Sequence, residues 1–424
     1  MKPMTSSDHA AITAVSRVGK VDRLLRKRLF AGLAGLRHGR LVIQDCLGST
    51  TLGDGEPTVH LAVGDMAFYR LVATHGSVGA GGAYGAGMWG CDDLVGLVSL
   101  LVRNRDTLDD MESGLARLAA WVLKAWHAGN RNTRAGSRRN IAAHYDLGND
   151  FFSLFLSQDL MYSSALWEGA DDTLEAASRR KLDLICRKLD LQPGDQVMEI
   201  GSGWGGFAIH AARHYGCHVT TATISQEQHA LAVARVREAG LQDRVKVVLR
   251  DYRDLQGQYD KVVSIEMIEA VGARFLEGYF RKISDLLQPR GRALVQAITI
   301  EDHRYAQALR SVDFIKRYIF PGSFIPSIEA MLRAKTRACD LALVHLEDFG
   351  LSYARTLQAW RQQFLAHLPL VRAQGFDERF CRMWEFYLAY CEGGFRERSI
   401  GVSHLLLTHP QARVAGDRWV PEQP

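Results

Sequence analysis

A glycine-rich segment in the second half of the chain has the spacing of a cofactor site. Residues 197–206 read VMEIGSGWGG, which predicts a buried strand, a tight turn and the start of a helix. Gly201, Gly203 and Gly205 leave no Cβ between the backbone and a ligand. A bare glycine turn also occurs in dinucleotide enzymes, so the acid that precedes it, Glu199, is the more informative residue.

Glu199 stands where methyltransferases that use S-adenosylmethionine (SAM) carry an acid. SAM presents a sulfonium, an ammonium group and a ribose diol, so its pocket needs acids, hydroxyls and carbonyls rather than a phosphate cradle. Thr223 and Gln228 follow the second predicted strand and supply such groups. Asp251 and Tyr252 follow the third, where the adenine would lie. The order predicts a SAM pocket at the strand ends.

The elements around this turn predict an α/β fold with a parallel sheet covered on both faces. Between the predicted strands lie stretches of helical periodicity, and two later apolar runs complete a Rossmann-like sheet of seven strands. A long aromatic-rich insert, 300–336, precedes those two runs. The seven predicted strands are 196–200, 218–222, 245–249, 261–265, 293–297, 341–346 and 402–407.

The first part of the chain predicts a smaller α+β domain, 1–130, joined by a linker at 131–137 to the larger domain, 138–424. Its predicted elements are an amphipathic helix near 21–30, strands at 40–44 and 58–63, a glycine-dense loop at 76–90, and helices at 92–102 and 115–130.

Charge is segregated along this front part. Residues 1–44 carry a net charge of +7, residues 45–116 carry −7, and residues 117–140 carry +6, although the whole chain carries only +5. Two basic segments beside an acidic module predict either an anionic partner such as a lipid headgroup or solvated helix faces. A net charge this small does not indicate nucleic acid.

Composition excludes several classes of protein. With 47% hydrophobic residues and 23% charged residues the chain is neither disordered nor fibrous, and no apolar run reaches the ~20 residues of a membrane span. The N-terminus lacks a secretory signal, so we expect a cytoplasmic protein. Its seven cysteines contain no CxxC pair, which predicts neither a disulfide framework nor a metal site.

Over most of residues 138–400 the sequence resembles the cyclopropane-fatty-acyl-phospholipid synthase family, which includes the mycolic acid cyclopropane synthases. The front part resembles the bacterial form of that family more loosely. The segments that carry the resemblance are AHYDLGNDFF at 143–152, MYSSALW at 161–167, the glycine turn, 264–272, YIFPG at 318–322 and 387–398.

The resemblance implies a SAM-dependent methyltransferase that modifies the cis double bond of an acyl chain in a phospholipid. It implies a peripheral location on the inner face of the membrane and is compatible with a homodimer. Carried over by motif, the cofactor residues are Tyr162, Ser163, Gly201, Gly203, Thr223, Gln228 and Tyr252, to which the residue-based argument adds Glu199 and Asp251.

Relatives also hold a bicarbonate ion through a Cys, a Glu, a His and a Tyr. The resemblance assigns the Glu to Glu269 and the Tyr to Tyr353, but it places Ser164 at the cysteine and Gln296 at the histidine near the fifth strand. Ala270 replaces a further histidine. Neither Ser164 nor Gln296 can carry the charge of a histidinium, so bicarbonate stays an open question.

The reaction requires an alkene held in line with the methyl group, aromatic faces beside the resulting cation, and a base. Glu269 is the residue we expect to orient that base. The aromatic candidates are Tyr318, Phe320, Phe324, Trp384, Phe386, Tyr387 and Tyr390.

The proton that the base removes decides the product. The first expectation is a cyclopropane, and the alternative is a methyl- or methylene-branched chain without a ring. A small-molecule SAM methyltransferase and an inactive lipid-binding relative are further alternatives.

Overall fold

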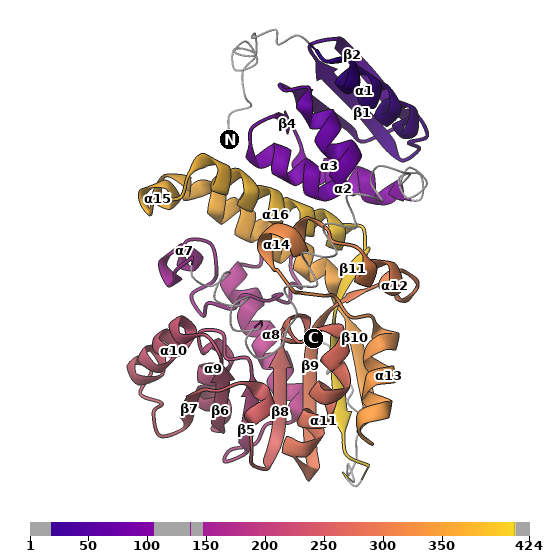
Figure 1. Cartoon of the computed structure of the whole chain (residues 1–424). Helices are drawn as coiled ribbons and strands as arrows, with labels where there is room; N and C mark the ends of the chain where they lie inside the picture. The colour runs from indigo at the N-terminus through magenta and orange to yellow at the C-terminus, as the bar shows by residue number, and fades with distance from the viewer. Residues whose placement is uncertain (1–17, 106–135, 137–146, 411, 413–424) are drawn as a thin grey trace.

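The chain folds into two parts that lie one above the other (Figure 1). This computed structural model describes residues 18–105, 136, 147–410 and 412. We call residues 18–105 the N-terminal module and residues 147–410 the catalytic part. The helix predicted at 115–130, the linker predicted at 131–137 apart from residue 136, and residues 143–146 of the AHYDLGNDFF segment lie outside the described residues.

The N-terminal module is a four-stranded mixed sheet with helices against it. The strand order is β2-β1-β3-β4, in which β1 and β3 are parallel and the other pairs are antiparallel. Burial alternates along β3, as expected for a sheet with one covered face. Its elements are α1 (Lys20–Leu33), β1 (Gly39–Asp45), β2 (Gly48–Asp54), β3 (Thr58–Val63), α2 (Ala67–Gly85), β4 (Trp89–Cys91) and α3 (Leu94–Arg103).

The prediction of a loop at 76–90 is wrong, because most of this stretch belongs to helix α2. The helix kinks at Gly76, where φ is +53°. Its glycines serve close packing: a Cβ at Gly81 would lie 2.2 Å from the Phe314 ring, and one at Gly85 would lie 2.6 Å from Met383. The glycines are needed because α2 packs closely against the catalytic part, and this packing outweighs their low helix propensity.

The catalytic part contains the predicted seven-stranded sheet, in the order β10-β11-β9-β8-β5-β6-β7. Strand β11 is antiparallel to its two neighbours, and the other pairs of neighbouring strands are parallel. All seven predicted strands are present, and β9 is longer than expected. The strands are β5 (Gln196–Ile200), β6 (His218–Thr223), β7 (Val245–Leu249), β8 (Tyr259–Ile265), β9 (Leu287–Ile300), β10 (Ala342–Asp348) and β11 (Ile400–Thr408).

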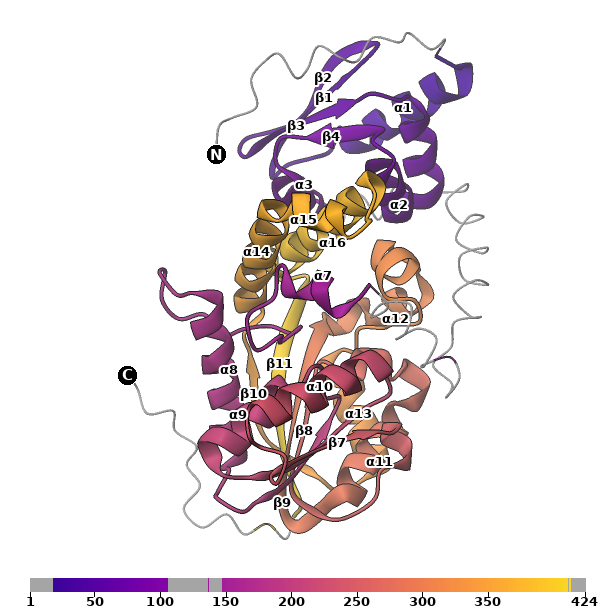
Figure 2. The same ribbon diagram turned by 90° about the vertical axis from the view of Figure 1, so that its left-hand side faces the viewer.

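Helices cover both faces of this sheet, as Figure 2 shows from the side. Successive residues of β5 point to opposite faces: Val197 packs in the core beneath α8 and α9, whereas Met198 packs in the core beneath α11 and α13. The helices are α7 (Asn149–Ser153), α8 (Leu174–Leu189), α9 (Gly206–Tyr215), α10 (Gln226–Glu238), α11 (Leu276–Leu286), α12 (Asp302–Arg310), α13 (Ile328–Ala338), α14 (Gly350–Ala366), α15 (Leu368–Ala373) and α16 (Glu378–Arg396).

The predicted aromatic insert divides into two halves with different roles. Its first half forms α12 and a short π-helical segment, Ile315–Ile319. Its second half begins helix α13, whose Met331 and Ala334 pack into the core of the sheet. The insert is thus only partly available to a ligand.

Helix α16 connects the two parts. It packs against α14 on one side and against α2 and α3 of the N-terminal module on the other. Across this boundary Arg382 donates to the backbone oxygens of Tyr84 and Trp89, at 2.6 and 2.8 Å, and the Tyr84 hydroxyl donates to Glu385 at 2.9 Å. Figure 1 shows α14, α15 and α16 between the module and the sheet.

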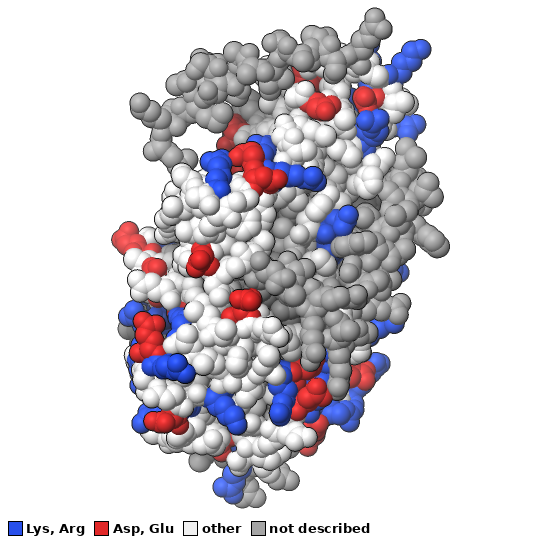
Figure 3. Space-filling view, turned by 60° about the vertical axis from the view of Figure 1, so that its left-hand side comes forward, with Lys and Arg blue, Asp and Glu red and all other residues white. Residues whose placement is uncertain are grey.

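On one face of the molecule, charges of both signs are mixed. On the face drawn in Figure 3, Lys and Arg are interspersed with Asp and Glu over the catalytic part. Among the helices that the structure describes, none combines the length and the apolar character that crossing a membrane requires.

Candidate active site

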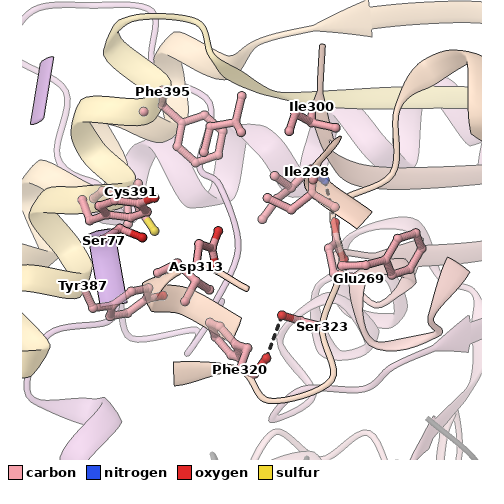
Figure 4. Close-up of a pocket in the computed structure, with 18 of the residues that line it drawn as sticks. Ser77, Glu269, Ile298, Ile300, Asp313, Phe320, Ser323, Tyr387, Cys391 and Phe395 are labelled. Atoms are coloured by element: carbon pink, nitrogen blue, oxygen red, sulfur yellow. Dashed lines mark hydrogen bonds between the residues drawn. The ribbon is translucent and has the colours of Figure 1, made fainter. Parts of the chain in front are cut away.

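A large cavity, ≈ 1290 Å³, runs from the strand ends of the catalytic part into the N-terminal module. Its polar end lies at the carboxyl ends of β5, β6 and β8, where open α/β sheets bind ligands. Its apolar end is lined by side chains of the module, among them Leu33, Leu41 and Leu61. Figure 4 shows part of the wall, with Glu269, Phe320, Tyr387 and Phe395 around the open space.

The glycine turn after β5 forms part of the polar end. Gly201 and Gly205 have φ values of +97° and +84°, which L side chains rarely adopt. A Cβ at Gly201 would meet Met267 at 3.1 Å, and one at Gly206 would meet Met161 at 2.6 Å. Gly203, with φ +48°, has open space where its Cβ would be. The turn fits a ligand that approaches the backbone closely.

Hydroxyl, amide and acid groups surround this turn. Thr223 Oγ1 donates to the amide oxygen of Gln228 at 2.9 Å, which leaves the Gln228 amide nitrogen as a donor. Glu199 is buried and accepts from Thr221 at 2.5 Å. Burial raises the pKa of Glu199 to about 8.

The third strand contributes an acid and a ring. Asp251 is buried, and its carboxylate accepts from the Arg253 guanidinium at 2.8 and 2.6 Å. The ion pair keeps a negative charge in the wall without an unpaired buried carboxylate. Tyr252 lies beside it, and burial raises the pKa of its hydroxyl to about 12.

The loop before α8 forms another part of the cavity wall through residues 160–163. The Tyr162 and Tyr387 hydroxyls lie 2.9 Å apart, so the loop contacts α16 directly. Ser163 accepts a hydrogen bond from the buried Lys181 at 2.9 Å. Burial lowers the pKa of Lys181 to about 8.

The residues that the resemblance assigns to an anion meet at another side chain, Glu266. The Ser164 backbone N–H and Gln296 Nε2 donate to Glu266 Oε1 at 2.9 and 2.7 Å. The Tyr353 hydroxyl donates to Glu266 Oε2 at 2.7 Å. The Ser164 hydroxyl instead donates to the carbonyl of Ala165, so this residue contributes through its backbone.

Glu269 lies one turn further along the chain, in the same wall. Its Oε1 accepts from the backbone N–H of Ile298 at 2.6 Å (Figure 4), and its Oε2 has no hydrogen-bond partner among the described residues. Burial and the neighbouring charge of Glu266 raise the pKa of Glu269 to about 8. Burial also raises the pKa of Glu266, but its three hydrogen-bond donors oppose that shift, so Glu269 is the first of the two acids to take up a proton.

The structure places every cofactor residue expected from the sequence on the wall of this one cavity, and Glu269, Tyr353 and Ala270 line it as well. Ser164 and Gln296 are buried beyond that lining and reach it through Glu266. Five of the aromatic candidates line the cavity: Phe320, Phe324, Phe386, Tyr387 and Tyr390.

The other two aromatic candidates have structural contacts. The Tyr318 hydroxyl packs against helix α2, because a Cβ added at Gly82 would lie 2.9 Å from it. Trp384 stacks on Phe380 and contacts the Phe151 ring edge to face.

Sequence reasoning missed Glu266 and the residues behind it. The family resemblance includes its segment, 264–272, but assigns a role there only to Glu269. The signal that could have found Glu266 is the three-residue interval, which brings two acids to one wall. His404 and Lys188 gave no signal, because a His in an apolar strand and a Lys on a helix are both common.

Comparison with known proteins identifies the fold and the chemistry. Residues 132–405 match the family described as mycolic acid cyclopropane synthetase. The chain is 38% identical to the tuberculostearic acid methyltransferase UfaA1 of Mycobacterium tuberculosis, over 86% of each chain. It is 36% identical to the cyclopropane-fatty-acyl-phospholipid synthase of Escherichia coli, over 82% of this chain and 87% of that one.

A solved structure agrees with this assignment. The mycolic acid cyclopropane synthase CmaA1, complexed with SAH and CTAB, superimposes with a TM-score of 0.59 at 29% identity, over 64% of this chain and 97% of that one. The matched family, the glycine turn and the acidic strand ends agree, and the chain therefore belongs to the mycolic acid cyclopropane synthetase family and is a SAM-dependent methyltransferase.

Proposed function

We propose that the chain transfers the SAM methyl group to an olefinic carbon of an unsaturated acyl chain carried by a membrane phospholipid. The observation that carries the proposal is the single cavity, because it joins the cofactor turn to a long apolar space. A water-soluble acceptor would not need such a space. The relatives' names, which refer to fatty-acyl phospholipid and to tuberculostearic acid, support the same class of substrate.

The proposed roles follow from the geometry. SAM supplies an electrophilic methyl group. The wall residues Gly201, Gly203, Thr223, Gln228 and Asp251 hold the cofactor, and the apolar end holds the acyl chain so that the double bond faces the polar end. Phe320 and Tyr387 line the same cavity (Figure 4). Their faces can stabilise a desolvated carbocation by ~2 kcal/mol.

For the product, we place methylation without ring closure first and cyclopropane formation second. The anion site departs from the bicarbonate-binding set at Ser164 and Gln296, and Ala270 replaces a neighbouring histidine. A relative that matches over most of the chain is named a methyltransferase. The ring-closed product, our first expectation from the sequence, stays a prediction.

One experiment tests both statements. Purified protein is incubated with SAM carrying a CD₃ group and with vesicles of cis-monounsaturated phosphatidylglycerol, and the released acyl chains are examined by mass spectrometry. A simple methyl branch retains three deuterium atoms, whereas a ring or a methylene group retains two, and chromatography against standards separates those two.

Vesicles of saturated phosphatidylglycerol are the matched control. Methylation of a soluble amine without vesicles, with no change in the lipid, would contradict the proposal and favour a small-molecule methyltransferase.

A further inference from the structure

Three hydrogen-bond donors surround the Glu266 carboxylate in the cavity wall. Its three donors come from three separate segments: the loop before α8, strand β9 and helix α14. Hydrogen bonds to an ionised acceptor are roughly twice as strong as neutral ones. The site is therefore built to hold one negative charge at this point.

The donors are those that the family resemblance assigns to a bicarbonate ion. Ser164, Gln296 and Tyr353 already donate to the Glu266 carboxylate at 2.7–2.9 Å. A bicarbonate ion at the same donors would place a second anion against Glu266, next to Glu269. Bicarbonate therefore does not fit the residues present.

A buried chain of hydrogen bonds fixes the direction of the Gln296 donor. The Lys188 ammonium, which can only donate, lies 3.0 Å from His404 Nδ1, so that nitrogen accepts. His404 Nε2 then carries the proton and donates to Gln296 Oε1 at 2.9 Å. The Gln296 NH₂ group consequently points to Glu266.

The far end of this chain is an ion pair between Lys188 and Glu347. Lys188, His404 and Gln296 are all buried, and burial keeps the pKa of His404 well below its usual range. The imidazole is therefore neutral, and its tautomer is set by Lys188. These three residues are positioning residues for the Glu266 carboxylate.

The backbone at Glu266 is also unusual. Its φ is +48°, in the left-handed region, although it is not a glycine. Such a conformation costs roughly 1–3 kcal/mol and persists only where the surroundings determine it. The three hydrogen bonds to its carboxylate hold Glu266 in this conformation. A glycine would adopt it without strain.

One acceptor position of Glu266 remains open. A carboxylate has about four lone-pair positions, and the three donors use two on Oε1 and one on Oε2. Glu266 lines the cavity, as do Glu269 and Tyr353. The remaining position on Oε2 is available to a proton from a ligand.

We propose that Glu266 replaces the exchangeable anion of the family and is the proton acceptor of the reaction, so that this enzyme works without bicarbonate. This inference rests on the proposed function. The π pair of the alkene forms the new C–C bond as the C–S bond breaks with its electron pair left on sulfur. Glu266 then takes a proton from the cation, and the C–H pair forms the alkene or ring bond. Glu266 becomes a neutral acid that later releases the proton to water.

The first test measures dependence on the anion. Wild-type turnover on unsaturated vesicles is compared in CO₂-free buffer with and without added bicarbonate, and we expect equal rates. Loss of activity in the CO₂-free buffer would overturn the inference while leaving the methyl transfer itself established. Absence of methylated lipid in both buffers would instead overturn the proposed function.

The second test removes the carboxylate. We expect E266Q to lose at least about 100-fold in turnover, the scale of a missing general base, with unchanged SAM affinity by calorimetry. The exposed Glu277→Gln is the matched control and should keep wild-type turnover. E266Q with wild-type turnover would overturn the inference.

The third test removes the Glu266 side chain and supplies a small anion from solution in its place. E266G relieves the backbone strain and leaves the three donors without an acceptor, so added bicarbonate or formate should restore at least tenfold of the lost turnover. The same salts should not change E277Q. If E266G binds SAM but stays inactive with either anion, the assigned role is wrong.

Discussion

The two ends of the cavity hold their side chains in opposite ways. At the polar end, Glu199, Asp251 and Glu266 each accept a hydrogen bond from a specific donor at 2.5–2.9 Å. At the apolar end, Leu33 and Leu41 belong to one continuous hydrophobic core. Hydrogen bonds fix positions, whereas apolar contacts fix volume. The polar end therefore determines the chemistry, and the apolar end determines which chains can reach it.

The largest expected effect comes from filling the cofactor turn. Gly201→Val puts a branched side chain on a residue with φ +97° and against Met267. We expect SAM affinity to fall by roughly 100-fold, since left-handed strain for such a residue is about 3 kcal/mol. Isothermal titration calorimetry measures it.

The control is Gly278→Ala, because a Cβ at Gly278 in α11 meets no atom within 4 Å. Normal SAM binding by Gly201→Val would mean that the polar end is not the cofactor end.

A second variant acts only on the apolar end. Ala73→Phe, on α2, adds a ring to the cavity wall. We expect kcat/KM for a long-chain phospholipid to fall by about tenfold, because the ring takes the space of several buried methylene groups at ~0.8 kcal/mol each. SAM affinity should not change.

Steady-state kinetics with vesicles provide the measurement, and Ala234→Phe on the exposed side of α10 is the control. Equal losses in both variants would remove the distinction between the two ends.

A third prediction concerns pH and the buried acids of the polar end. The pKa of Glu269 is raised from 4.5 to about 8, so between these values the folded chain binds more protons than the unfolded chain. The free energy of unfolding therefore decreases as pH rises through that range. Glu269→Gln should remove this contribution. Between pH 5 and pH 8 its free energy of unfolding should fall by roughly 3 kcal/mol less than that of wild type, because each pH unit between the two pKa values changes it by up to about 1.4 kcal/mol.

Urea titrations at pH 5 and pH 8 provide the measurement. Glu277→Gln, at an exposed acid, should leave the pH dependence as in wild type. A Glu269→Gln curve parallel to wild type would show that this carboxyl titrates normally.

The smallest expected effect is on the outer surface above the apolar end. Helix α1 exposes Arg23, Lys27 and Arg28 together with Val21 and Leu24, a combination that suits a membrane surface. Arg26, which lies in the same helix, pairs with Asp45 at 2.6 Å and covers the Phe30 ring. We propose that this helix contacts anionic lipid.

Reversing Arg23, Lys27 and Arg28 to Glu should weaken sedimentation with anionic vesicles at least several-fold at low salt, because an anionic surface attracts exposed basic residues and repels acidic ones. The same change at Arg187, Arg213 and Arg237, which are exposed on the catalytic part, is the control. Equal binding of all three proteins would exclude α1 as the contact.

The sequence predicted the polar end far better than the apolar end. Strand ends carry recognisable residue types at fixed spacing, which is why the turn at Gly201 and the acids at Glu199 and Asp251 could be placed before the fold was known. The seven strands followed from their apolar periodicity. The part of the wall formed by α2 has no such signature. Its glycines predicted a loop because helix propensity depends only on neighbouring residues. The contact of Gly81 with Phe314 joins residues far apart in the sequence, so it could not be predicted.

Glu266 shows the remaining limit. Its role depends on Tyr353 and Gln296, which lie 87 and 30 residues away. A motif identifies a residue type. The donors that reach a carboxylate depend instead on how the sheet and α14 are arranged in the fold. The resemblance named Ser164, Gln296 and Tyr353 as a group, and the structure brings all three to the Glu266 carboxylate, which the motifs did not indicate.

Helix α16 has a consequence for how the molecule unfolds. Because it packs on α14 and also on α2 and α3, removing the N-terminal module would expose one side of a helix that forms the core of the catalytic part. Neither part can lose its structure without exposing apolar surface of the other. The two parts should therefore melt in a single cooperative transition, as one folding unit with two tasks.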